Sequence, residues 1–196
     1  MGSREDILGA LRRNAPAETP PPDLSKLGVI FADPIAQFAK AAVGVGGACI
    51  QAADLPAADA AVAALPQLAG ARKVVSLVPG VGHPTLELGD VATPQALDDV
   101  EVTILRGEFG VAENAAVWVE GQALLHRVIF AITNHLILVV ATADLVSNMH
   151  QAYARLAGRR PRYGLFISGP SKTADIEQVL VVGAQGARTC TVLLVG

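Results

Sequence analysis

The stretch Tyr163-Gly-Leu-Phe-Ile-Ser-Gly-Pro-Ser-Lys-Thr-Ala-Asp-Ile-Glu177 sets the expected fold of this chain. Its apolar first third predicts a β-strand. The Gly169-Pro170 pair then predicts a tight turn, because glycine tolerates a positive φ and proline restricts the residue before it. Residues 171–180 have apolar positions at helical spacing, and Ser171 or Thr173 can cap a helix there. We therefore expect a strand, a tight turn and a helix.

Apolar runs alternate with helical patterns along the rest of the chain. The predicted strands are residues 48–52, 73–78, 100–105, 115–119 and 134–139, with a further apolar strand at the end of the chain. The predicted helices are residues 34–44, 55–69 and 144–157, and residues 108–114 are a predicted turn. This alternation predicts an α/β fold with a mainly parallel sheet.

The N-terminal part differs in composition from the rest of the chain. Residues 1–14 predict a short amphipathic helix, in which Ile7, Leu8 and Leu11 form a narrow apolar stripe. Residues 15–28 are rich in proline and predict an extended linker. Residues 29–196 are the predicted α/β domain. The N-terminal helix either docks, on this domain or on another subunit, or is a frayed terminal helix.

Composition limits the classes of function. Hydrophobic residues make up 52% of the 196 residues, which is enough for one sizeable core. The net charge of −3 gives no basic surface for nucleic acid. No signal peptide is expected, because charged residues follow the start directly, and the apolar run at 136–143 is too short to span a bilayer. We expect a cytoplasmic protein without a membrane span. Charged residues are sparse, which is compatible with a surface that is covered by a partner or by a second copy in a homo-oligomer.

The chain has few residues that are suited to metal binding. Its two cysteines, Cys49 and Cys190, are far apart in the sequence and lack C-x-x-C spacing. An iron–sulfur cubane takes four thiolates, so we expect this chain to hold none by itself. The four histidines show no helical metal-ligand spacing, so no metal site is predicted.

Several motifs together resemble one known family. They are residues 169–177, Gly183-Ala-Gln-Gly186, Gly110-Val-Ala-Glu-Asn114, Val117-Trp-Val119 and Asn134-His-Leu-Ile-Leu-Val139. In these motifs the chain resembles the LUD-domain family, the lactate-utilisation protein C group. Ala115 departs from the pattern, which has glycine there. The resemblance implies a three-layer α/β fold with a mainly parallel central sheet flanked by helices, resembling the NagB/RpiA/CoA transferase-like fold.

The same resemblance implies a function. The chain would be an accessory subunit of a cytoplasmic L-lactate oxidation system, and it would act with iron–sulfur subunits that carry the electrons. It implies no cofactor on this chain and iron–sulfur clusters on the partners.

The turn after the 163–167 strand is the first predicted ligand site. Its ligand-binding candidates are Gly169, Ser171, Lys172, Thr173 and Asp175. Free amides at a helix start, with the cation of Lys172, suit a small carboxylate or phosphate. The resemblance and the preference of ligands for the carboxyl ends of parallel strands support this hypothesis. The alternative is a capped helix whose own Asp175 and Glu177 satisfy the helix dipole.

Glu113 and Asn114 form the second predicted site. A glutamate at a turn between apolar strands is expected to be partly desolvated, which suits a nucleophile or a base. The CoA transferases to which the fold is related use a glutamate in a Glu-Asn-Gly context, and the match here is incomplete. Asn114 and His135 are further ligand-binding candidates. The alternative interpretations are that Asn114 only forms the turn and that His135 is a structural histidine. This site favours an alternative function, an independent enzyme or binding protein for an acyl-CoA or a phosphorylated small molecule.

Overall fold

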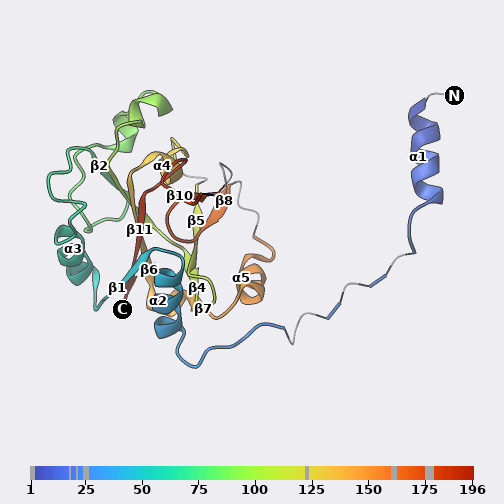
Figure 1. The fold of residues 1–196 in the computed structure, drawn as a ribbon, viewed down its shortest axis with the longest axis horizontal. Helices are drawn as coiled ribbons and strands as arrows, with labels where there is room; N and C mark the ends of the chain where they lie inside the picture. Colours follow the sequence, from blue (N-terminus) through green and yellow to red (C-terminus); the bar gives the residue numbers. More distant parts are fainter. Residues whose placement is uncertain are drawn as a thin grey trace.

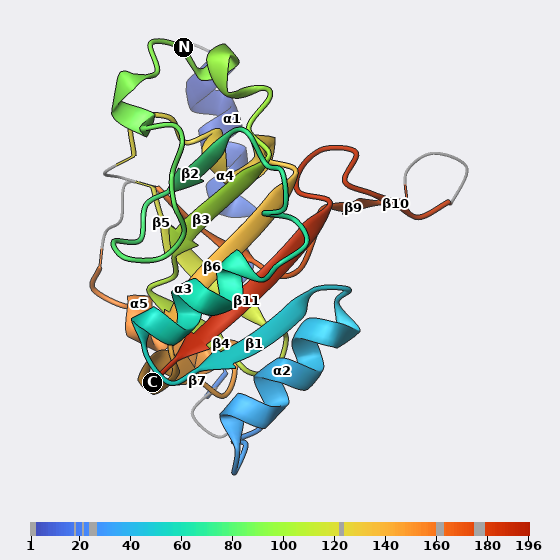
Figure 2. The same ribbon diagram turned by 90° about the vertical axis from the view of Figure 1, so that its left-hand side faces the viewer.

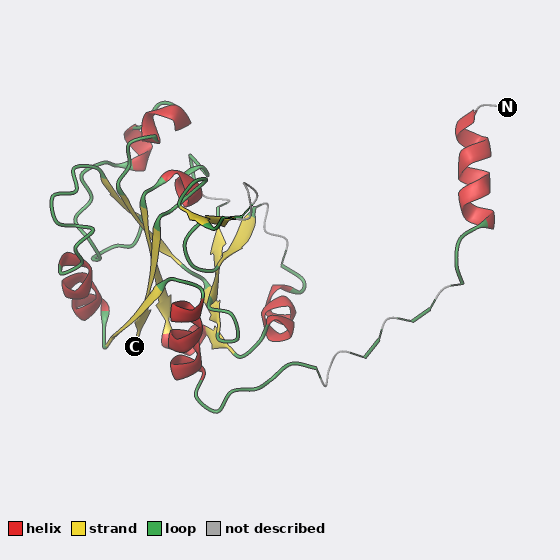
Figure 3. Ribbon diagram, viewed as in Figure 1, coloured by secondary structure: helices red, strands yellow, loops and turns green. Residues whose placement is uncertain are grey.

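The computed structural model describes residues 3–17, 19–20, 22–23, 27–121, 124–159, 163–174 and 179–196. Its helices are α1 Ser3–Arg13, α2 Pro34–Gly44, α3 Leu55–Ala63, α4 Ile129–Ile132 and α5 Met149–Leu156, with 3₁₀ turns η1 Leu88–Asp90, η2 Pro94–Leu97 and η3 Thr142–Asp144. Its strands are β1 Ala48–Ala52, β2 Val74–Ser76, β3 Val102–Arg106, β4 Phe109–Val111, β5 Ala116–Glu120, β6 His135–Ala141, β7 Leu145–Val146, β8 Gly164–Ile167, β9 Lys172–Thr173, β10 Val181–Val182 and β11 Thr189–Val195. Figures 1 and 3 show a layered body, with α1 apart from it.

Five strands form an all-parallel central sheet in the order β1-β11-β6-β3-β2. Its two longest strands, β6 and β11, are neighbours, with His135 opposite Thr189 and Ala141 opposite Val195. Between their ends both strands are buried without a break, which is typical of parallel strands covered on both faces. The predicted α/β class with a mainly parallel central sheet and flanking helices is confirmed.

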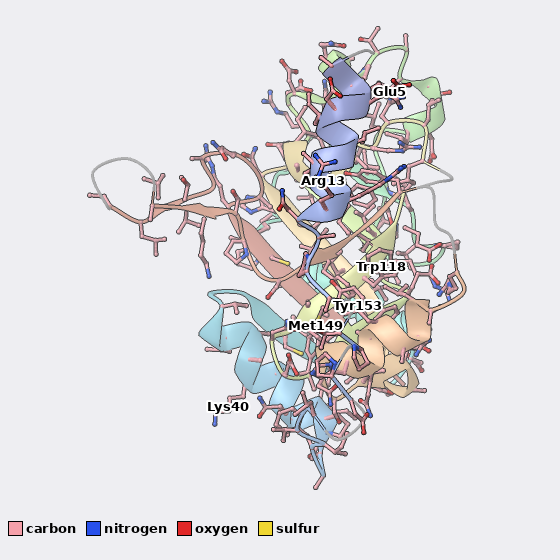
Figure 4. All side chains as sticks on the ribbon, turned by 90° about the vertical axis from the view of Figure 1, so that its right-hand side faces the viewer. Glu5, Arg13, Lys40, Trp118, Met149 and Tyr153 are labelled. Atoms are coloured by element: carbon pink, nitrogen blue, oxygen red, sulfur yellow. The ribbon has the colours of Figure 1, made fainter. Side chains whose placement is uncertain are left out.

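A second sheet covers one face of the central sheet. Its order is β7-β4-β5-β8, and β5 is antiparallel to both of its neighbours. Helix α5 packs on the outer side of this sheet, where Trp118, Met149 and Tyr153 lie close together (Figure 4). Helix α3 covers the opposite face of the central sheet (Figure 2). The layers are therefore α3, central sheet, second sheet and α5.

Helix α2 begins where the sequence predicts it and packs against both sheets. The Asp33 carboxylate accepts a hydrogen bond from the Ala36 amide at 2.9 Å, and Pro34 occupies the first turn, where it needs no amide partner. Phe38 is fully buried among residues of the central sheet, and its ring also lies against Gly110 of β4. One aromatic side chain therefore joins α2 to both sheets.

Helix α1 spans the predicted N-terminal helix and has no buried residue. Glu5 lies near its first turn and Arg13 at its last, which suits the helix dipole (Figure 4). The side chains of Ile7, Leu8 and Leu11 are 58%, 36% and 63% exposed. Its apolar stripe is therefore uncovered in the structure.

The predicted helix over residues 171–180 is wrong. Lys172 and Thr173 form β9, which pairs antiparallel with β10 in a small hairpin, and residues 175–178 lie outside the described residues. The Ser171 amide donates to the Ala187 carbonyl at 2.8 Å. This amide therefore pairs with a segment distant in the sequence and is not a free amide at the start of a helix. Leu180, expected on the apolar side of a helix, is 61% exposed.

Other boundaries differ from the predictions for local reasons. Helix α3 stops at Ala63, three residues before Pro66, which has no amide for a helical hydrogen bond. Helix α5 starts only at Met149, because the Asn148 side chain caps it by accepting from the Gln151 amide at 3.0 Å. Part of the predicted turn 108–114 is the short strand β4, in which Phe109 is fully buried.

Replacing Phe38 by alanine is expected to lower the free energy of unfolding by about 3–5 kcal/mol, because a fully buried aromatic ring is lost from the contact between α2 and both sheets. Urea denaturation followed by circular dichroism measures this change. Val43→Ala is the control on the same helix, since Val43 is 68% exposed, and it should change stability by less than about 0.5 kcal/mol. Equal losses in the two variants would contradict the packing described.

Candidate functional site

Three backbone segments meet at the turn that follows β8. Gly169 has φ +72°, and a Cβ atom there would lie 2.7 Å from the Val45 carbonyl oxygen. A Cβ atom at Gly47 would lie 2.9 Å from the Cys190 carbonyl oxygen and 3.6 Å from the Gly169 Cα atom. Such approaches leave no room for a side chain. The two glycines thus let the α2–β1 loop, the 168–171 turn and the start of β11 pack directly on one another.

This turn lies at the amino ends of the central strands and not at their carboxyl ends. Gly47 directly precedes β1, and Cys190 is the second residue of β11. The expectation that the turn sits where parallel strands usually bind ligands is therefore wrong, because β8 belongs to the second sheet and brings the chain back beside the amino edge.

The polar groups of the turn bond within the protein. The Lys172 ammonium donates a hydrogen bond to the Val45 carbonyl. The Ser171 carbonyl accepts from the Gly183 amide at 2.9 Å, and Thr173 pairs with Val181. No helix starts here, so the expected row of free helix amides is absent from the described part of the turn. Asp175, the remaining candidate, lies outside the described residues.

Asn114 of the β4–β5 turn also contacts the segment that follows β8. Its side-chain oxygen accepts from the Ala116 amide at 3.0 Å, and its carbonyl accepts from the Ser168 hydroxyl at 2.6 Å. Ala115 has φ +54° and is 2% exposed. An alanine therefore takes the left-handed conformation for which glycine was expected, at a cost of about 1–2 kcal/mol.

Glu113 sits on the exposed side of this turn. Its amide donates to the Ser147 carbonyl at 3.0 Å, which fixes the backbone beside α5. The expected partial desolvation of its side chain is not found, because the β4–β5 turn presents it to solvent.

Cys190 lies at this junction, and Cys49 packs against the same hydrophobic core. Ala115, Gly169 and Cys190 surround a space too small for a water molecule. Burial raises the pKa of Cys190 to about 12, against a smaller opposing effect from the Gly169 amide, and burial raises that of Cys49 to about 11. Both cysteines therefore stay protonated at neutral pH and act as core side chains.

His135 bonds within the central sheet. It is the first residue of β6, and its Nδ1 lies 2.9 Å from the Thr189 hydroxyl of β11. Burial, with a smaller effect of the nearby Arg188 charge, lowers the pKa of His135 below its ordinary value of 6.5, and Glu101 opposes this shift. The neutral imidazole is thus favoured beside its hydroxyl partner.

A separate cavity at the carboxyl ends of the central strands was missed by the sequence analysis. It has a volume of about 400 Å³ and lies beside Arg106, the last residue of β3. The signal for it was an arginine that directly follows an apolar strand. No sequence pattern shows, however, that the covering helix α3 leaves this region open.

The described parts of the chain hold no grouping of three or more His, Cys, Asp and Glu side chains that is suited to a metal ion. No helix among the described residues is both long and apolar enough to cross a membrane.

Comparison with known proteins points to one family. The LUD domain model matches residues 87–195, which include β3 to β11 with both predicted sites. A solved structure of a DUF162 family protein from Deinococcus radiodurans has a similar fold, with a TM-score of 0.62 at 18% sequence identity. The likeness covers 84% of this chain and 98% of that one. No curated protein matches the chain.

Gly169→Ala is expected to destabilise the protein more than Gly80→Ala. Both glycines have similar positive φ values, +72° and +77°, so each variant has the cost of a left-handed alanine, about 1–2 kcal/mol. Only Gly169 adds a clash with a backbone carbonyl, whereas a Cβ atom at Gly80 meets nothing within 4 Å. Chemical denaturation should show an excess loss of about 1 kcal/mol or more for Gly169→Ala. Equal losses would contradict the close approach.

His135→Gln is expected to make stability less sensitive to acid. Because the pKa of His135 is lower in the folded state, the unfolded state binds this proton more readily, and stability falls as the pH drops below about 6.5 towards the folded pKa. Melting temperatures measured from pH 7.5 to 5.0 test this, with the exposed His150→Gln as control. A parent protein and a His135→Gln variant with the same acid dependence would refute the assignment.

Proposed function

Since this chain belongs to the LUD-domain family, we propose that it is an accessory subunit of a cytoplasmic L-lactate-utilisation system that works with iron–sulfur subunits. The family resemblance supplies the metabolic setting. One feature of the molecule carries the accessory role, and that is the uncovered apolar face of α1.

Helix α1 has the properties of a docking helix. An isolated helix of 11 residues is marginal in water, so its stability depends on packing against another surface. Ile7, Leu8 and Leu11 form the stripe that an apolar groove on a partner would accept. The proline-rich linker 15–28 can separate α1 from the body by roughly 43 Å, at about 3.1 Å per residue of extended chain. This reach lets α1 bind a partner while the α/β body stays free.

The thiols support a division of labour between subunits. An iron–sulfur cluster normally takes four thiolates, and this chain has two cysteines. Burial raises the pKa of both thiols, to about 11 and about 12, which opposes their use as thiolate ligands. We therefore assign the clusters and the electron transfer to the partner subunits.

The alternative is an enzyme or binding protein for an acyl-CoA or phosphorylated small molecule, with Glu113 as nucleophile or base. It has less support, because Glu113 is exposed and Lys172 bonds to a backbone carbonyl. Turnover of an acyl-CoA that is lost in Glu113→Gln would favour it over the accessory role.

The test of the accessory role is purification of the tagged full-length protein, under anaerobic conditions, from lactate-grown source cells. The accessory role predicts iron-bearing, cysteine-rich chains in the purified material, identified by mass spectrometry and iron assay. Leu11→Glu should weaken their binding about tenfold or more, because loss of a buried leucine contact costs about 1.5–3 kcal/mol. Arg13→Gln changes the charge by the same amount on the opposite face of α1 and is the control.

Two results would contradict the proposal. Purification of the parent protein without other chains and without iron would contradict the accessory role. Equal partner binding by the parent protein and the Leu11→Glu variant would contradict docking through α1.

A further inference from the structure

The cavity at the carboxyl edge of the central sheet has the size and position that are typical of a small-molecule site. Its volume of about 400 Å³ lies within the usual range of ligand pockets, about 300–1,000 Å³. It is lined by Leu55, Val78, Pro79, Arg106, Val139, Ala141 and Val195. Leu55 is the first residue of α3, and the others come from the carboxyl-terminal parts of β3, β6 and β11 or from the loop after β2. Ligands of parallel α/β sheets are usually bound in this position.

The cavity exists because α3 covers only part of its face of the sheet. Helix α3 starts at Leu55 and packs on β1 and β11 (Figure 2). Val139 and Ala141 of β6 point to the same side as α3, because residues two apart on a strand share a face. Arg106 at the end of β3 and Ala141 at the end of β6 therefore border an open cavity beside α3.

The loop after β2 forms a fixed wall beside this opening. The Ser76 hydroxyl donates to the Val81 carbonyl at 2.6 Å, and the Gly82 amide donates to the Asp59 carboxylate of α3 at 2.7 Å. Gly82 has φ +71° and lies against Ile104, where a Cβ atom would be 2.3 Å from the Ile104 side chain. The loop is thus tied to both α3 and β3, and the cavity is formed before any ligand arrives.

Arg106 is the charged side chain among the lining residues. It is exposed, and none of the described residues forms an ion pair or hydrogen bond with its guanidinium. The other lining side chains are apolar. The cavity thus offers one planar cation, of the kind that binds a carboxylate through two hydrogen bonds, above an apolar floor.

We propose that this cavity binds a small monocarboxylate with an apolar chain, whose carboxylate meets Arg106 and whose chain lies on Val139, Ala141 and Val195. A sugar phosphate fits poorly, because its hydroxyl groups would be desolvated against apolar walls without partners. A dianionic phosphate would also keep one negative charge without a partner, because Arg106 is the one cation among the lining residues. The site lies at the opposite end of the sheet from the Gly169 turn, and it is independent of the docking role of α1.

The test uses the full-length protein and hexanoate as the probe, with hexanamide as its uncharged counterpart and inorganic phosphate as a second anion. Isothermal titration calorimetry is expected to give saturable binding of hexanoate that is at least about tenfold tighter than that of hexanamide or phosphate. Arg106→Gln should weaken hexanoate binding about tenfold. Lys40→Gln, which removes an exposed cation on α2 (Figure 4), should leave it unchanged.

A second pair of variants tests the apolar floor. Ala141→Phe places a ring in the cavity and should abolish hexanoate binding, while Ala60→Phe on the exposed side of α3 should not. Unchanged melting temperatures establish that each variant is folded. Equal binding of hexanoate and hexanamide, equal binding by the parent and Arg106→Gln, tighter binding of phosphate, or no binding at all would each overturn the proposal.

Discussion

The contact on which the rest of this structure depends is the close approach of Gly169 to the α2–β1 loop. Gly169 follows β8 of the second sheet, while Gly47 directly precedes β1 and Cys190 lies at the start of β11, both in the central sheet. Their backbones touch without side chains between them, so the contact sets how the two sheets sit on each other. Ala115, in its left-handed conformation, and Asn114 complete the junction from the β4–β5 turn.

This constraint explains why the predicted ligand turn is occupied by internal bonds. Lys172 bonds to the Val45 carbonyl, and Ser171 holds the strand-like hairpin to the segment before β11. A turn that joins two sheets has little freedom to close on a ligand. The two surfaces that we propose for binding, the stripe of α1 and the cavity beside Arg106, do not include this turn.

The sequence predicted the features that depend on local pattern. The apolar run of β6 and the capped start of α2 at Asp33 have signals within a few residues, and the motif at 169–177 led to the family that the domain match then showed. The helix over 171–180 failed because its apolar spacing also fits a hairpin, and the pairing of Thr173 with Val181 and of Ser171 with Ala187 has no local signal. The exposure of Glu113 and the opening above Arg106 depend on which elements cover which face. Such long-range packing leaves no signal in the local sequence pattern.

We propose that this chain serves a larger assembly through α1 and not through the turn at Gly169. Hydrogen–deuterium exchange of the full-length protein, alone and with the proposed iron–sulfur partners, tests this directly. Free α1 has no buried residue and should exchange fast. Residues 3–13 should become protected in the complex, while residues 168–173 should keep their exchange rate. Protection of the turn with no change in residues 3–13 would contradict it.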